Sequence, residues 1–194
     1  RDLHLSLRRQ RQMCIETAVA YSYIGPELTH PIYYDGSIGQ AKKHLYRTAD
    51  ELNEEYQDLE AYVSVNKAVV TQSSAAIPIV PLYISILFKI MKEKDLHEGC
   101  IEQMYRMMHD RLCADGGVPT DENRLIRMDD YEMRPEIQDA IQEIWHKISK
   151  ENIEELADID GYWEEFYEIF GFRIDGVDYE ADVDIQTAIP SLAE

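Results

Sequence analysis

The sequence has little cysteine, and the cysteines it has are not spaced for a zinc site or a disulfide framework. Cys14, Cys100 and Cys113 are the only three, and no two of them form a CxxC pair. Such spacing is typical of reduced thiols in a cytoplasmic protein. The six histidines include no HxxxH or HExxH pair, so we also expect no metal site.

Long apolar runs and basic side chains are scarce as well. The most apolar stretch, residues 77–91, is interrupted by Pro78, Pro81 and Lys89, whereas a membrane-spanning helix needs about 20 apolar residues. The 38 acidic and 19 basic side chains give a net charge of −19. Because such a surface repels phosphate backbones and anionic lipids, we expect no nucleic-acid partner and no membrane partner. No signal peptide is visible, and we predict a cytoplasmic protein.

The sequence also lacks a glycine-rich loop for a dinucleotide. No GxGxxG motif occurs, and the pair Gly116-Gly117 lies in an acidic stretch without a predicted strand before it. The chain begins at Arg1 without a methionine, and residues 1–14 are basic with little apolar periodicity. We therefore expect a fragment that has an atypical start and no pyrophosphate-binding loop.

Apolar periodicity in the first third of the chain predicts a strand, a helix and a second strand. Residues 15–23 and 61–65 are apolar and partly β-branched, which is typical of buried strands. Between them, Ser37 and Gln40 have the spacing of a capping box, with Ser37 as the cap. Apolar residues at three- and four-residue spacing then predict an amphipathic helix.

The rest of the chain reads as mostly helical. A loop over 66–76 precedes a helix over 82–94 that is apolar nearly all round and should be buried, with Pro81 near its first turn. A helix over 97–112 should face inward through Ile101, Met104, Tyr105, Met108 and Leu112. Two or three short acidic helices are predicted, roughly at 134–149, 153–157 and 161–170. This order indicates the end of an α/β sheet with a helical elaboration.

Two tyrosines and a lysine form the sharpest candidate for chemistry. Tyr23 precedes Tyr33 by ten positions, and eight residues separate Tyr33 from Lys42. In a reductase, a phenol aimed at a thioester oxygen donates a proton or a hydrogen bond as negative charge develops there. A nearby ammonium favours the phenolate and would lower the tyrosine pKa from about 10.

An alternative reading of these three residues is purely structural. The chain has 13 tyrosines, so a tyrosine and a lysine at this spacing also arise by chance. Tyr23 and Tyr33 would then be amphipathic core residues, and Lys42 a solvated helix lysine.

Several longer segments resemble one enzyme family. They are residues 20–27 (AYSYIGPE), 38–42 (IGQAK), 63–67 (VSVNK), 77–83 (IPIVPLY), 88–94 (FKIMKEK), 97–103 (HEGCIEQ), 171–172 (GF) and 176–179 (GVDY). In these segments the sequence resembles the bacterial trans-2-enoyl-CoA reductases and the related FabV-type enoyl-ACP reductases. The resemblance covers residues 16–182, which makes it more specific than a short motif.

The resemblance implies roles for particular residues. Tyr33 would be the proton donor of the Tyr-(x8)-Lys motif, Lys42 would hold the cofactor NADH, and Tyr23 would contact the substrate thioester and share the acid role. The nicotinamide carboxamide would lie against Val69, Val70 and Thr71. The acyl channel would be lined by Val80, Phe88 and Tyr162, which otherwise read as plain core residues.

The resemblance also implies a fold and a reaction. The fold would be the C-terminal portion of a Rossmann-type, short-chain-reductase-like α/β sheet with a helical substrate-covering region. The reaction would be NADH-dependent reduction of the trans-2 double bond of enoyl-CoA or enoyl-ACP, without metal or flavin, in a protein that is monomeric at full length. Residues 15–182 would form the catalytic and substrate-binding part, and residues 183–194 an acidic tail.

Two alternatives stay open on the sequence alone. One is a carbonyl reductase of the short-chain dehydrogenase type, whose tyrosine and lysine are usually separated by three residues, against eight here. The other is an inactive truncated product, or an acidic helical interaction module, which the missing glycine-rich loop favours.

Overall fold

The computed structural model describes residues 17–77 and 79–184. Residues 1–14, for which we expected an atypical start, lie outside the described residues, as does most of the acidic tail predicted from residue 183. The described residues contain no helix that is long and apolar enough to cross a membrane. They also contain no cluster of three or more histidine, cysteine, aspartate or glutamate side chains that could hold a metal ion.

A parallel sheet of three strands forms one half of the fold. Its strands β1 (Thr17–Ser22), β2 (Glu60–Val65) and β3 (Leu125–Arg127) lie side by side in the order β1-β2-β3. The helix α2 (Ser37–Glu55) connects β1 to β2, as expected for a parallel crossover. Both predicted strands are confirmed within two residues at each described end, and the helix predicted between them is confirmed; residues 15 and 16 lie outside the described part.

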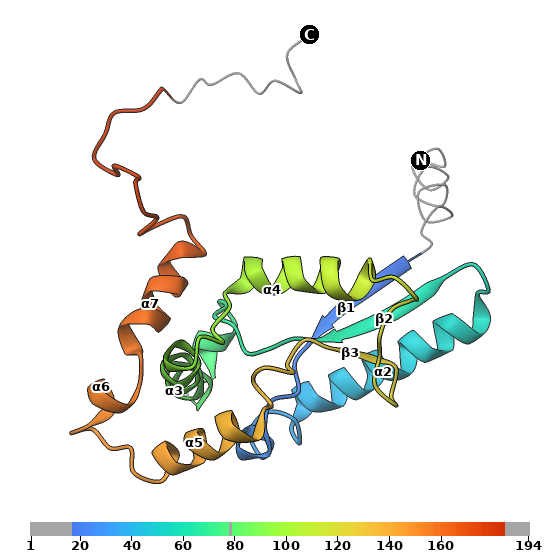
Figure 1. Cartoon of the computed structure of the whole chain (residues 1–194), viewed down its shortest axis with the longest axis horizontal. Coiled ribbons are helices and arrows are strands. Elements are labelled where there is room, and N and C mark those ends of the chain that lie inside the picture. Colours follow the sequence, from blue (N-terminus) through green and yellow to red (C-terminus); the bar gives the residue numbers. More distant parts are fainter. Residues whose placement is uncertain (1–16, 78, 185–194) are drawn as a thin grey trace.

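The sheet is covered on both faces (Figure 1). Val63 and Val65 of β2 point to the α2 side, where they pack with Leu45 and Ala49. On the other face, Ile126 and Met128 pack with Met107 at the end of α4 (Cys100–Met107). Strand side chains alternate between faces, so a sheet with helices on both sides needs apolar residues at successive positions.

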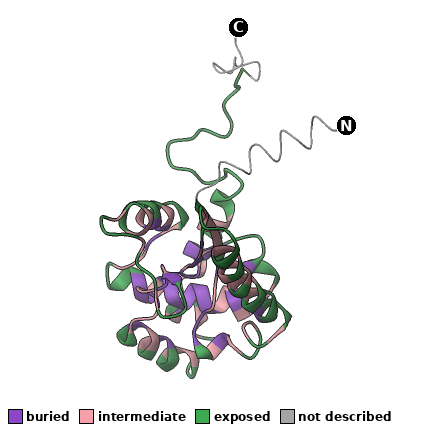
Figure 2. Ribbon diagram, turned by 90° about the vertical axis from the view of Figure 1, so that its right-hand side faces the viewer, coloured by how far each residue is buried: buried purple, intermediate pink, exposed green. Residues whose placement is uncertain are grey.

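The second half of the fold is built around one buried helix. Helix α3 (Ile79–Glu93) has nine buried residues and carries Pro81 in its first turn. It packs against α5 (Pro135–Trp145) and α7 (Ile159–Glu168), and the four-residue α6 (Ile153–Leu156) lies between these two in the chain. The prediction of a buried helix is confirmed, and Figure 2 shows the buried residues at the centre with exposed ones on the outer helix faces.

The predicted capping box is wrong. Ser37 is the first residue of α2, and Gly36, in an extended conformation, takes the cap position without any side-chain cap hydrogen bond. The amide of Gln40 donates to the Gly36 carbonyl at 3.1 Å. A run of turns over residues 30–36 brings the chain into the helix, so that the backbone alone starts it.

The inward face predicted for residues 97–112 is wrong at three of its five residues, whereas Met104 and Leu112 are partly buried and pack against the core cluster as predicted. The helix α4 starts at Cys100 and continues as the π-helical turn η3 (Met108–Leu112), and Ile101, Tyr105 and Met108 are 76%, 67% and 51% exposed. The reason is polar. Gln103 is fully buried, and its side-chain oxygen accepts a hydrogen bond from the Lys67 amide. Arg106 donates hydrogen bonds to the Glu98 carboxylate and to the Met128 carbonyl. These hydrogen bonds fix the rotation of the helix, because buried polar groups need partners.

Candidate active site

A cavity of about 410 Å³ opens where β1 and β2 end. Its walls come from the segment after β1, the start of α2, the loop after β2 and the start of α3. The carboxyl ends of parallel strands are the usual place for ligands in α/β folds, because the loops that follow the strands converge there. Six of the residues singled out in the sequence line this cavity: Tyr23, Tyr33, Lys42, Val69, Thr71 and Val80.

Three other residues singled out in the sequence do not line it. Val70 is 5% exposed and belongs to the core around α3. Phe88 is fully buried and packs edge to face on the His97 ring, with 4.6 Å between ring centroids. Tyr162 lies behind the wall, where its hydroxyl is 3.4 Å from the Oγ of Ser74, a residue that does line the cavity.

The two tyrosines of the cavity contact each other. The rings of Tyr23 and Tyr33 meet edge to face, with centroids 5.3 Å apart and planes at 67°. The Tyr23 hydroxyl donates to Oε1 of Glu132 at 3.1 Å, whereas the Tyr33 hydroxyl has no hydrogen-bond partner among the described residues. Tyr33 is therefore the one of the pair whose proton is free to point into the cavity.

The electrostatics of the cavity differ from the expectation for a phenolate. Burial raises the pKa of the half-buried Tyr33, and burial lowers the pKa of the Lys42 ammonium. The expectation that Lys42 lowers the pKa of Tyr33 is wrong for the described residues. The reason is that removal from water disfavours both charged forms, phenolate and ammonium alike. Tyr33 is thus a neutral phenol that still carries its proton.

Glu132 is a site residue that the sequence did not reveal. It lies in the turn between β3 and α5, has no solvent exposure, and accepts hydrogen bonds from the Tyr83 hydroxyl at 2.7 Å and the Ala68 amide at 2.7 Å, besides the one from Tyr23. Burial raises its pKa, while the Tyr83 hydrogen bond, the Ala68 hydrogen bond and the Lys67 charge act in the opposite direction. No motif marks it, because its partners are 49 to 109 positions away.

Lys67 is the second buried charge that was missed. It is 1% exposed, its Nζ donates to its neighbour's carbonyl at Ala68 (2.9 Å), and its ammonium lies 5.2 Å from the centre of the Phe88 ring. Burial lowers the pKa of Lys67, and the negative charge of Glu132 offsets part of this shift. The ammonium and the Glu132 carboxylate thus partly compensate each other inside the core.

The loop after β2 is pinned by its own hydrogen bonds. The Ser74 hydroxyl donates to the Thr71 carbonyl at 2.7 Å, and the Ser74 amide donates to the Thr71 hydroxyl at 3.1 Å. The Thr71 amide in turn donates to the Ser74 hydroxyl at 3.0 Å. These bonds hold Val69 and Thr71 at the cavity wall in a fixed conformation.

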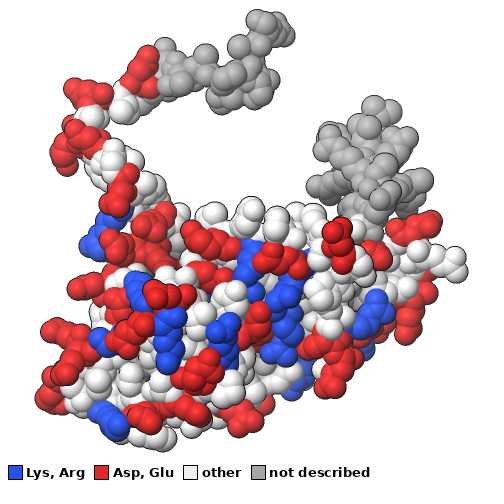
Figure 3. Space-filling model, viewed as in Figure 1, with Lys and Arg blue, Asp and Glu red and all other residues white. Residues whose placement is uncertain are grey.

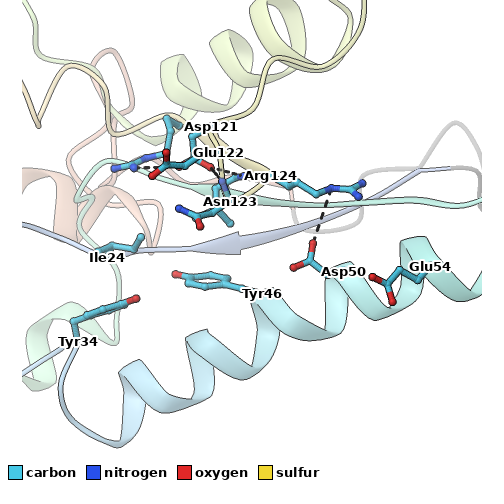
Figure 4. A pocket seen from close by; sticks show the side chains of 11 residues that line it. Ile24, Tyr34, Tyr46, Asp50, Glu54, Asp121, Glu122, Asn123 and Arg124 are labelled. Atoms are coloured by element: carbon cyan, nitrogen blue, oxygen red, sulfur yellow. Dashed lines mark hydrogen bonds and ion pairs between the residues drawn. The ribbon is translucent and has the colours of Figure 1, made fainter.

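A second and larger cavity, of about 540 Å³, has a different character (Figure 4). It lies between α2 and the loop before β3, and Asp50, Glu54, Asp121 and Glu122 contribute four carboxylates to its wall. Its arginines are already paired, Arg124 with Asp50 at 3.9 Å among them. The groove would repel phosphate groups, and acidic side chains are also spread over the face of the molecule seen in Figure 3. The smaller cavity is therefore the candidate active site.

The comparison with known proteins decides the family. The family model described as "Trans-2-enoyl-CoA reductase catalytic region" matches residues 10–113. The chain belongs to the trans-2-enoyl-CoA reductase family. A second model, described as "Enoyl reductase FAD binding domain", matches residues 120–183. The predicted family is confirmed.

Similar proteins are named for NADH-dependent reduction. The chain is 55% identical over 177 residues to the enoyl-[acyl-carrier-protein] reductase [NADH] of Coxiella burnetii, covering 90% of this chain and 44% of that protein. It is 53% identical over 176 residues to the trans-2-enoyl-CoA reductase [NADH] of Ruminiclostridium cellulolyticum, with the same coverage. The chain thus spans less than half the length of these relatives.

Solved structures of the family share the fold. The trans-2-enoyl-CoA reductase of Clostridium acetobutulicum in complex with NADH superposes with a TM-score of 0.82 at 47% identity, over 87% of this chain and 43% of that one. The Treponema denticola enzyme in complex with NAD gives 0.82 at 49% identity, over 86% and 42%. These likenesses confirm the predicted Rossmann-type α/β fold.

The residues of the second matched segment do not fit a flavin dinucleotide. Two hollows that the described part of 120–183 helps to line are the acidic groove and a hollow beside α6, where Lys92 is bonded to Asp158 at 2.6 Å. Neither offers a free cation or a glycine-rich turn for a diphosphate. Lys42, Val69 and Thr71 line the smaller cavity, and the described residues contain no GxGxxG turn for a diphosphate.

Proposed function

We propose that this chain provides the acid-bearing and nicotinamide-facing side of an NADH-dependent trans-2-enoyl thioester reductase. The substrate would be enoyl-CoA or enoyl-ACP, and the product the saturated acyl thioester. The observation that carries the proposal is that Tyr33, Tyr23 and Lys42 line the same cavity at the carboxyl ends of the strands. The family membership and the NADH named for its relatives support the same reaction.

Tyr33 is the proton donor in this proposal. Bound NADH would supply a hydride to the β-carbon, which leaves negative charge on the thioester oxygen. The free hydroxyl of Tyr33 donates to that oxygen as the charge develops, and its raised pKa keeps the proton in place until then. Tyr23 contacts the substrate without donating a proton, because its own hydrogen is engaged by Glu132. The proposal therefore gives the acid role to Tyr33 alone, whereas the resemblance implied that Tyr23 shares it.

The remaining residues orient the two reactants. The Lys42 ammonium would hold the ribose hydroxyls next to the nicotinamide, and the backbone of Val69–Thr71 would receive the carboxamide. Val80 forms the apolar wall against the acyl chain, and Phe88 and Tyr162 support that wall from behind. Residues 15–182 form this catalytic part, in a protein that we propose to be cytoplasmic and monomeric at full length.

The test is NADH consumption with crotonyl-CoA, followed by the loss of NADH absorbance. The wild-type chain, Tyr33→Phe and Tyr34→Phe are compared, because Tyr34 is the adjacent tyrosine but faces the acidic groove. Turnover that persists in Tyr34→Phe and falls in Tyr33→Phe by about a hundredfold or more supports the proposal. Equal rates for the two variants would contradict it.

A second substrate distinguishes the enoyl reductase from the alternative, a carbonyl reductase of the short-chain dehydrogenase type. Acetoacetyl-CoA carries a ketone where crotonyl-CoA carries a double bond, and a carbonyl reductase would reduce it faster. Preference for crotonyl-CoA is expected here. Absence of both turnover and NADH binding would show that the chain is an inactive piece of the enzyme, which is the non-enzymatic alternative.

A further inference from the structure

The floor of the candidate active site is organised by one buried carboxylate. Oε1 of Glu132 accepts from the hydroxyls of Tyr23 at 3.1 Å and Tyr83 at 2.7 Å, and Oε2 accepts from the Ala68 amide at 2.7 Å. Its main-chain carbonyl accepts from Nε2 of Gln138 at 2.7 Å, which fixes the turn that carries it. Glu132 therefore cannot move without breaking bonds to three other segments of the chain.

The arrangement sets the direction of each hydrogen bond. An ionised carboxylate only accepts, so both hydroxyls that reach it must donate their hydrogens. The Tyr23 hydrogen is therefore directed at Glu132 and not at the cavity. Burial raises the pKa of Glu132, but the hydrogen bonds from Tyr83 and Ala68 and the charge of the buried Lys67 ammonium favour its ionised form.

The same carboxylate also reaches the opposite wall. Ala68 precedes Val69, the first of the residues expected to face the nicotinamide, and the Lys67 ammonium donates to the Ala68 carbonyl. Glu132 also holds the Tyr23 hydroxyl, and the Tyr23 ring packs edge to face on the Tyr33 ring. The wall formed by the two tyrosines is thereby connected to the loop that carries Ala68. One side chain thus holds the proton-donor wall and the cofactor loop in a fixed relation.

We propose that Glu132 is a positioning residue that holds the Tyr23 hydrogen away from the cavity and couples the tyrosine pair to the loop at residues 67–71. Tyr33 is then the only proton donor of the pair. This inference rests on the proposed function for its kinetic consequence, but the lock itself is a property of the folded chain. Glu132 touches neither substrate nor cofactor and acts through Tyr23 and Ala68.

The variant Glu132→Gln tests the lock. Glutamine has one acceptor oxygen and one donor amide, so it cannot accept from both walls at once. Either its NH2 group confronts the Ala68 N–H, or it donates to the tyrosine hydroxyls and releases the Tyr23 hydrogen toward the cavity. Glu54→Gln is the control, because Glu54 is an exposed carboxylate on the wall of the acidic groove, away from the candidate active site.

The first readout is proton NMR of the folded chain without any ligand. Two low-field, slowly exchanging hydroxyl signals are expected, one lost in Tyr23→Phe and the other in Tyr83→Phe. Glu132→Gln should move or remove both and should speed amide exchange at residues 68–71, whereas Glu54→Gln should leave all of these unchanged. An unchanged Tyr23 signal in Glu132→Gln overturns the proposal.

Two further comparisons complete the test. If Glu132→Gln does not fold, Tyr83→Phe decides, because losing one of two donors on the same oxygen must displace the Tyr23 signal, and an unchanged signal overturns the lock. In an active preparation, Glu132→Gln should lose about ten- to hundredfold in kcat with little change in the KM for crotonyl-CoA. Hydroxyl signals that behave as expected in a chain without turnover would refute the proposed function and leave the lock standing.

Discussion

Tyr83→Phe removes one hydroxyl group from the middle of the core and leaves the ring in place. Tyr83 is 1% exposed, and its hydroxyl donates to the Glu132 carboxylate at 2.7 Å and accepts from Nε2 of Gln138 at 3.2 Å. Gln138 keeps its bond to the Glu132 carbonyl, so the main loss is a hydrogen bond to a buried charge. Such a bond contributes about 1.5–3 kcal/mol to the free energy of unfolding.

The expected result is a clear loss of stability. In a chain of this size about 2 kcal/mol corresponds to a fall in Tm of roughly 4–8 °C. Urea unfolding followed by circular dichroism measures the change directly. Tyr105→Phe is the control, because Tyr105 is 67% exposed and its hydroxyl has no partner in the described part of the chain, so its substitution should change the free energy of unfolding by less than about 0.5 kcal/mol.

The pH dependence gives an independent check on the same group. Burial first, and then the Glu132 charge, raise the pKa of both Tyr83 and Tyr23 well above 10. Above about pH 10 the unfolded chain loses these protons while the folded chain keeps them. The contribution of these two tyrosines to the free energy of unfolding is therefore fully present below about pH 10. It is lost as the pH rises through their pKa values in the folded chain. The loss per pH unit should be smaller in Tyr83→Phe. A variant as stable as Tyr105→Phe, with an unchanged alkaline slope, would refute the reasoning.

Three further substitutions probe other parts of the structure. Gly39→Ala should destabilise the fold by about 1–3 kcal/mol in thermal unfolding, because a Cβ there would overlap the backbone carbonyl of Tyr34. Arg127→Met leaves the Asp129 carboxylate, which is 2% exposed, without its two hydrogen bonds to Arg127. It should lower the free energy of unfolding in urea by about 3–5 kcal/mol. Arg47→Met, which removes an exposed ion pair, should lower it by less than about 0.5 kcal/mol. Lys42→Met should weaken NADH binding about tenfold in a fluorescence titration and leave the unfolding transition unchanged within about 0.5 kcal/mol; equal affinity would contradict its cofactor role.

The parts of the fold that depend on local pattern could be predicted from the sequence. The predominantly apolar stretch at residues 79–91 is the buried helix α3, because a helix that is apolar nearly all round has no face to leave in water. The strands β1 and β2 follow in the same way from short β-branched runs. Tyr23, Tyr33 and Lys42 lie at one cavity because they follow β1 and begin α2, and a parallel crossover brings those segments to one edge of the sheet.

What depended on distant polar partners could not be predicted. The apolar pattern of α4 pointed to Ile101 and Tyr105 as inward residues, but Gln103 and Arg106 set its rotation through bonds to residues 8 to 36 positions away. Glu132 lies in an acidic segment and looks like any surface glutamate until the fold buries it beside Tyr23 and Tyr83. The direction of the pKa shift of Tyr33 depends on burial, which the spacing of Tyr33 and Lys42 does not reveal.

The central claim is that the smaller cavity holds the nicotinamide and the enoyl group. The most direct test is chemical-shift mapping of the labelled chain during titration with NADH and then with butyryl-CoA, an unreactive saturated analogue. The account predicts shifts concentrated at Tyr23, Tyr33, Lys42, Val69 and Thr71, with none along the groove of Asp50 and Asp121. Shifts centred on that acidic groove or on α5–α7, or no shifts at saturating ligand, would contradict the claim.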